Sequence, residues 1–175
     1  YPCRAIDLAS FIPIGDLSNA PDEVAGDVLG WRHEASGREL TFLSLRSRVA
    51  IVEVTDPESP VIIETIVGPS SHWHDVKVIG HYAYGVSEGG SGIQVMDMSD
   101  IDSGVVTLVQ NKTQQGHWST HNIAANTDSG YLYPSGGNTQ NGGLDPVNTT
   151  NPADPIIVGA WNQMYVHDAQ IVSYT

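Results

Sequence analysis

The chain has 175 residues, which is enough for one domain with a sizeable core. Only 15% of the residues are charged, while 18 glycines and 10 prolines favour a turn-rich β protein over helices or disorder. Twenty acidic residues against seven basic ones give a net charge of −13, so nucleic acids and anionic membrane surfaces are poor partners. No run of 18 apolar residues occurs, and no membrane span is expected.

Short strands joined by tight turns are predicted along the whole chain, and no stretch has a sustained helical period. An opening strand at 5–14, broken by Pro13, is followed by an acidic loop and then by the first repeated unit. The strands expected after it are 27–31, 40–45, 49–54, 61–66, 71–79, 82–87, 93–100, 105–109, 119–125, 131–133, 144–150, 156–158 and 165–172.

A strand–turn–strand unit at 48–66 returns twice further along the chain. Its first strand is rich in β-branched residues, and its turn contains Asp56 and two prolines, which stop a strand and reverse the chain. Asp100 and Asn151 occupy the same turn position, at spacings of 44 and 51 residues. In the third copy Pro146 lies inside the first strand, which predicts an edge strand or a bulge there.

Four short strands per repeat of this length are typical of the blades of a β-propeller. The expected fold is therefore an all-β, partial propeller of four-stranded blades, with about three blades plus one strand. The units are approximately 26–70, 71–117, 118–164 and 165–175, the last being the start of a fourth blade. The remaining blades are expected from missing chain or from a second copy, and the alternative fold is a β-sandwich with accidental internal similarity.

A histidine followed by Asp or Asn stands near the start of each expected innermost strand. The pairs are His74-Asp75, His121-Asn122 and His167-Asp168, and Asp27 occupies the equivalent position of the first unit. Innermost strands converge on the propeller axis, so these side chains are expected to lie together at one mouth of the channel. Imidazoles and carboxylates would suit a transition metal, and carboxylates with an amide would suit Ca²⁺. The alternative is structural, with each polar residue bonding the neighbouring blade.

Several other residues carry weaker signals. His72 and His117 are expected to be loop histidines in solvent, and Glu88 could present a carboxylate on a glycine loop, although its glycines more simply turn the chain. The four tryptophans, Trp31, Trp73, Trp118 and Trp161, are expected to pack between blades, and the alternative is a platform for sugar rings. Asn111 and Asn148 begin glycosylation sequons, and Cys3 is a candidate half-disulfide whose partner lies elsewhere.

The chain also resembles a known family. The motifs that carry the resemblance are the repeat VAIVEVTDPESPVIIETI, Asp27–Trp31, Trp73–Val78, Val86-Ser87-Glu88 and His167–Gln170. They are similar to the LVIVD-repeat proteins of the choice-of-anchor B family, over essentially the whole chain and as the N-terminal part of such a protein. The resemblance implies a secreted or surface-anchored β-propeller and says little about activity.

Two function classes remain open from the sequence. The first is a secreted or cell-surface propeller that acts as a binding or structural module for a protein or glycan partner. The second is a metal-dependent hydrolase or lyase with a His/Asp site at the channel mouth, where a metal activates water and a histidine moves a proton. The first is favoured because no activated nucleophile, nucleophile elbow or phosphate-binding loop is visible.

Overall fold

The computed structural model describes residues 4 and 6–174, and this part of the chain is almost entirely antiparallel β-structure. Its helical content is the one-turn helix α1 (Ile14–Leu17) and two short 3₁₀ turns, Ile101–Ser103 and Gln140–Gly142. None of the helices in these residues is long and apolar enough to cross a membrane. The all-β prediction is therefore confirmed.

Three four-stranded sheets follow one another along the chain, and each is a meander in chain order. The first contains β1 (Ala25–Arg32), β2 (Glu39–Leu45), β3 (Arg48–Glu53) and β4 (Val61–Val67). The second contains β5 (His74–Ile79), β6 (Tyr82–Ser87), β7 (Ile93–Asp97) and β8 (Thr107–Lys112). The third contains β9 (Asn122–Asn126), β10 (Tyr131–Ser135), β11 (Val147–Asn148) and β12 (Ile156–Ile157).

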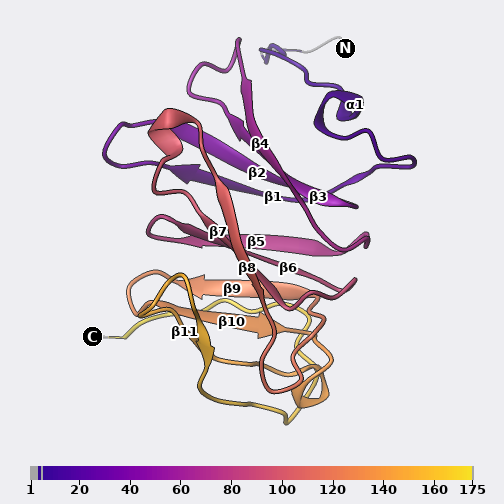
Figure 1. Ribbon diagram of the computed structural model, residues 1–175, viewed down its shortest axis with the longest axis vertical. Coiled ribbons are helices and arrows are strands. Elements are labelled where there is room, and N and C mark those ends of the chain that lie inside the picture. The colour runs from indigo at the N-terminus through magenta and orange to yellow at the C-terminus, as the bar shows by residue number, and fades with distance from the viewer. Residues whose placement is uncertain (1–3, 5, 175) are drawn as a thin grey trace.

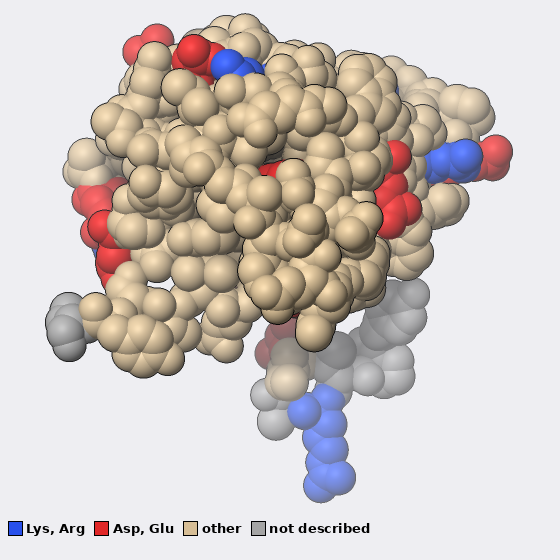
Figure 2. Space-filling model, turned by 90° about the horizontal axis from the view of Figure 1, so that it is seen from below, with Lys and Arg blue, Asp and Glu red and all other residues tan. Residues whose placement is uncertain are grey.

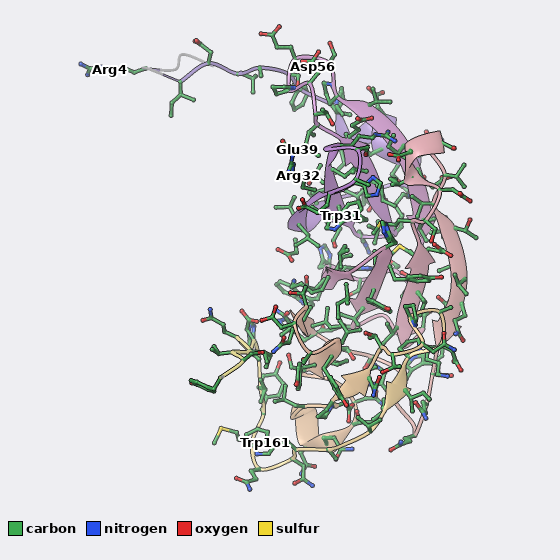
Figure 3. All side chains as sticks on the ribbon, turned by 90° about the vertical axis from the view of Figure 1, so that its left-hand side faces the viewer. Arg4, Trp31, Arg32, Glu39, Asp56 and Trp161 are labelled. Carbon is green, nitrogen blue, oxygen red and sulfur yellow. The ribbon has the colours of Figure 1, made fainter. Side chains whose placement is uncertain are left out.

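The sheets are stacked along the longest axis of the molecule (Figure 1), with the first strand of each beside the first strand of the next. Their first strands β1, β5 and β9 begin at a common place, where residues 25–27, 74–75 and 121–122 line one cavity. In a second view the sheets follow an arc, with Asp56 near one end and Trp161 near the other (Figure 3). The first strands of the three sheets thus lie side by side, as expected.

Apolar side chains fill the spaces between the sheets. One cluster joins the first two sheets and includes Phe42 and Ile51 from the first and Val76 and Met96 from the second. Another joins the second and third sheets through residues such as Val95 and Ile123. β3, with the continuous apolar run at 49–52, is therefore covered on both faces, and so is β7, in which the polar Gln94 is buried as well.

The repeated turns have the predicted chemistry. Asp56 Oδ1 accepts a hydrogen bond from the Glu58 N–H at 3.0 Å, and the Asp56 carbonyl accepts one from the Ser59 N–H. The third copy departs from the pattern at Pro146. β11 is not an edge strand, since it lies between β10 and β12, but it has only two residues and begins directly after the proline. Pro146 has no N–H to donate, so it interrupts the ladder instead of marking an edge.

Two predicted strands are absent from the described residues. Residues 6–13 form no strand, and the chain turns into α1 after Pro13, while Ile12 and Leu17 pack against the first sheet. Residues 165–172, expected to begin a fourth blade, are also irregular. Both segments have strand-like composition, but neither finds a partner strand in the described chain, and a strand is stable only when it is paired. The prediction of a further strand at each end was therefore wrong.

Charged side chains are sparse at the end of the molecule formed by the third sheet. Figure 2 shows this end as an almost uncharged surface, with acidic groups gathered towards its margins. The acidic excess of the sequence therefore does not form one patch on this face.

Candidate functional site

A cavity of about 540 Å³ lies where β1, β5 and β9 begin. Its walls come from all three sheets because the first strands start side by side there. The lining residues are Val24, Ala25, Gly26, Asp27, His72, Trp73, His74, Asp75, His121 and Asn122. Five of the seven residues predicted to form a site, namely Asp27, His74, Asp75, His121 and Asn122, are therefore brought to one place.

Asp75 is buried in β5, and its carboxylate joins two sheets. Oδ2 accepts a hydrogen bond from the Ile123 N–H of β9 at 3.0 Å, while Oδ1 accepts from the Val76 N–H and from the Lys77 ammonium. Burial, and next the neighbouring Asp27 carboxyl, raise the pKa of Asp75 to about 6, while Lys77 acts in the opposite direction. Because both oxygens are hydrogen-bonded, Asp75 connects the second sheet to the third. This is the structural alternative of the sequence analysis, in which each polar residue bonds its neighbouring unit.

Asp27 belongs to β1 and is the more accessible of the two carboxylates. Its side chain is 52% exposed, and Oδ2 lies 3.9 Å from Lys77 Nζ, a distance too long for a hydrogen bond. Asp27 therefore presents a partly exposed carboxylate to the cavity, next to the buried carboxylate of Asp75.

His74 begins β5 and is buried against its own sheet. Its Nε2 lies 3.2 Å from Ser87 Oγ, and burial is the main cause that lowers the pKa of this imidazole. A neutral imidazole bonded to a buried hydroxyl supports the hairpin between β5 and β6. His74 is therefore not joined to the other two predicted histidines by any hydrogen bond that the described residues show.

His121 and His167 do meet. Their Nε2 atoms lie 2.9 Å apart, although His121 precedes β9 and His167 lies beyond the third sheet in the irregular segment. Glu88, in the glycine loop after β6, places Oε1 2.7 Å from His121 Nδ1. An ionised carboxylate only accepts, so His121 donates through Nδ1, its Nε2 accepts, and His167 donates through Nε2. From the sequence, Glu88 could present a carboxylate on a glycine loop, but its partner His121 lies 33 residues further along the chain and is identified only by the structure.

The remaining predicted residues have simpler environments. Asn122 is the first residue of β9 and lines the cavity, whereas Asp168 Oδ1 accepts a hydrogen bond from the next N–H, that of Ala169, at 2.7 Å. Trp73 is 56% exposed and its ring centroid lies 5.5 Å from that of His121. The prediction that all four tryptophans pack between blades does not describe Trp73, which lines the cavity, or Trp118, which is also 56% exposed.

The predicted metal site with three histidines and neighbouring carboxylates is not formed in residues 4 and 6–174. No three His, Cys, Asp or Glu side chains of this part of the chain are arranged to hold one ion. Two of the three predicted imidazoles meet, while His74 and Asp75 are engaged in structural hydrogen bonds.

A second histidine network, centred on His117, was not predicted from the sequence. His117, expected in solvent, is buried, and its Nε2 lies 3.0 Å from Thr120 Oγ1 while Nδ1 lies 3.1 Å from Asp145 Oδ2. Asp145 also accepts a hydrogen bond from the Thr139 hydroxyl. His72, by contrast, is exposed as predicted. Nothing in the spacing of His117 marks it as buried, because its carboxylate partner lies 28 residues further along the chain.

The predicted modification sites differ in accessibility. Asn111 is exposed on β8, whereas Asn148 is half-buried on β11, where its Nδ2 lies 3.2 Å from the Tyr131 hydroxyl and its Oδ1 accepts from the Thr150 N–H. Asn111 is thus the better placed of the two for a glycan. Cys3, the candidate half-disulfide, lies outside the described residues.

The chain matches no protein-family model, and neither the comparison with curated proteins nor the comparison with solved structures found a match.

Proposed function

We propose that the protein is a β-propeller of the LVIVD-repeat type and acts as a secreted or cell-surface binding module for a glycan or protein partner. Three successive four-stranded meanders with adjacent first strands support the propeller, because this is how propeller blades are built and arranged. The resemblance to choice-of-anchor B proteins and the exposed sequon at Asn111 support an extracellular location.

The cavity where the first strands begin is the observation that carries the binding function. Its volume of about 540 Å³ falls in the range of small-ligand sites, and its walls combine an accessible indole with polar groups. Trp73 offers a flat apolar surface for the C–H face of a sugar ring. Asp27, Asn122 and His72 offer acceptors and donors for hydroxyl groups. This combination favours a glycan over a flat protein surface.

Replacement of Trp73 tests the glycan site. We expect Trp73→Ala to weaken binding of oligosaccharides by about tenfold, because the variant loses the exposed indole face on which a sugar ring would stack. The measurement is a titration with a panel of neutral and acidic oligosaccharides, followed by backbone amide shifts of Asp27 and Asn122 in NMR spectra. Trp118→Ala is the matched control, since Trp118 is also 56% exposed but does not line the cavity. Equal binding by both variants, or no shift with any sugar, would contradict the proposal.

A metal-dependent hydrolase is the second candidate, and one observation favours it. In the Glu88–His121–His167 arrangement two imidazole nitrogens lie 2.9 Å apart, the Glu88 carboxylate orients His121, and His121 itself lines the cavity. A metal held there would polarise a substrate oxygen or activate water. The binding module remains the better supported proposal, because Asp75 and His74, the residues expected to assist such chemistry, are occupied by structural hydrogen bonds.

A further inference from the structure

We propose that His121 and His167 form a binding site for one divalent transition-metal ion, with Glu88 as the positioning residue of His121. The two Nε2 atoms face each other at 2.9 Å, and Glu88 Oε1 lies 2.7 Å from His121 Nδ1. The site stands on these three side chains and does not depend on glycan binding.

The hydrogen-bond pattern leaves the Nε2 atoms of His121 and His167 as the candidate metal ligands. Glu88 holds the proton of His121 on Nδ1, so the Nε2 lone pair of His121 points at His167. A carboxylate bonded to the far nitrogen is the usual support of a metal-binding histidine, since it fixes the tautomer and raises the basicity of the ligand nitrogen. A metal ion would take the place of the proton that now lies between the two Nε2 atoms, and neutral His167 would change tautomer, so that this proton moves from its Nε2 to its Nδ1.

The fit requires only a small adjustment. Two zinc–nitrogen bonds of about 2.0–2.1 Å at a tetrahedral angle place the nitrogens roughly 3.4 Å apart, so the imidazoles must separate by about 0.5 Å. His167 can provide this movement, because it lies outside the sheets and its neighbour Val166 is held by one hydrogen bond to the Gly142 carbonyl. His121, whose side chain is 12% exposed, stays fixed by Glu88.

The chemistry of the donors selects the ion. Imidazole nitrogens suit Cu²⁺, Ni²⁺ and Zn²⁺, whereas Ca²⁺ and Mg²⁺ require oxygen ligands. No third His, Cys, Asp or Glu of the described chain is placed to bind the same ion. The ion therefore keeps open coordination positions for water or for a ligand in the adjoining cavity, which His121 also lines. The affinity should therefore be lower than that of a structural zinc site with four protein ligands.

The test is a calorimetric titration of the protein with CuCl₂, NiCl₂, ZnCl₂ and CaCl₂ at pH 7.5. We expect one saturable site for the first three ions, tightest for Cu²⁺, and none for Ca²⁺. His121→Ala and His167→Ala should each weaken binding at least tenfold, and Glu88→Gln should weaken it by about 10–100-fold, the usual effect of losing an orienting carboxylate. Nitrogen-15 spectra of the histidine rings should show both Nε2 signals move on metal addition while His121 Nδ1 stays protonated.

Two variants separate this site from nonspecific binding by surface histidines. His72→Ala removes an exposed histidine of the same cavity, and His81→Ala removes one that lines a different cavity, near the β5–β6 turn; both should bind metal as the parent does. His167 belongs to none of the three sheets, so His167→Ala should fold as the parent does. This variant therefore tests the site even if His121→Ala fails to fold. Saturable binding that survives His167→Ala, or the absence of any saturable site, overturns the proposal.

Discussion

At the scale of single residues, the network around His117 links the β8–β9 loop to the β10–β11 loop through one buried imidazole. The order Thr120 hydroxyl, His117 imidazole, Asp145 carboxylate is that of a catalytic triad, but Thr120 is completely buried and no substrate can reach its hydroxyl. Burial alone would raise the pKa of the Asp145 carboxyl, yet hydrogen bonds from His117 and Thr139 outweigh this effect and lower it. The network therefore stabilises the fold and takes no part in chemistry.

Removal of the imidazole should destabilise the protein in a pH-dependent way. Because the pKa of Asp145 is lowered in the folded state, its contribution is present above the unfolded value of about 3.9 and is lost as pH falls through the folded value. We expect His117→Ala to lower the free energy of unfolding by about 1–3 kcal/mol at pH 7, since it leaves buried partners unpaired. The cost should shrink towards pH 3, as measured by urea unfolding across this range.

His81→Ala is the control for that experiment, because His81 is exposed. It should change the free energy of unfolding by less than about 0.5 kcal/mol at any pH. A cost for His117→Ala that is equal at pH 7 and pH 3 would show that the ionised Asp145 carboxylate is not what the imidazole stabilises.

Residue spacing predicts which side chains share a neighbourhood but not which atoms bond. The spacing of 46 residues between His121 and His167 correctly placed these two together. The same argument placed His74 beside them. His74 does line the cavity with His121, but its imidazole is hydrogen-bonded to Ser87 and not to the other two histidines, and the spacing did not predict this bond. Partners such as Ser87 and Glu88 come from other strands and loops, so their position depends on the fold and on rotamers that a repeat pattern does not contain.

At the scale of secondary-structure elements, strands that are buried on both faces could be predicted from the sequence. β3 follows the continuous apolar run at 49–52, and the turn after β3 is closed by Asp56 as its sequence indicates. The terminal segments failed because their composition resembles a strand while no neighbour pairs with them; Ile6 and Phe11 are 75% and 77% exposed. Composition reports the preference of a segment, whereas pairing depends on what lies beside it.

The third sheet should open before the other two. β11 and β12 pair over only two residues each because Pro146 interrupts the ladder, whereas β6 and β7 pair over four. In hydrogen exchange followed by mass spectrometry, we expect amides of β11 and β12 to exchange at least tenfold faster than those of β6 and β7, since local opening follows the density of pairing and burial. Exchange of β11 at the rate of β7 would mean that side-chain packing, and not the ladder, limits opening there.

At the scale of the whole molecule, stability lies between the sheets as much as within them. The two main apolar clusters each join a pair of neighbouring sheets, and the second sheet contributes to both. Polar contacts reinforce the same junctions: Arg38 of the first unit bonds Glu53 and the Ile101 carbonyl, and Lys112 of the second pairs with Asp154 of the third. In the described part of the chain the main contacts between sheets therefore join neighbouring sheets, as in repeat architectures.

This arrangement predicts that a core substitution acts on the nearest junction first. Phe42 is fully buried between the first and second sheets, and Phe42→Ala should cost about 3–5 kcal/mol of unfolding free energy. Measured by hydrogen exchange, protection should fall in β1–β8 and change little in β9–β12. Ile123→Ala is the mirror control, because Ile123 is equally buried but joins the second and third sheets, so it should spare β1–β4. If both variants reduced protection equally in all three sheets, the molecule would be a single cooperative unit, and the nearest-neighbour description would have to be abandoned.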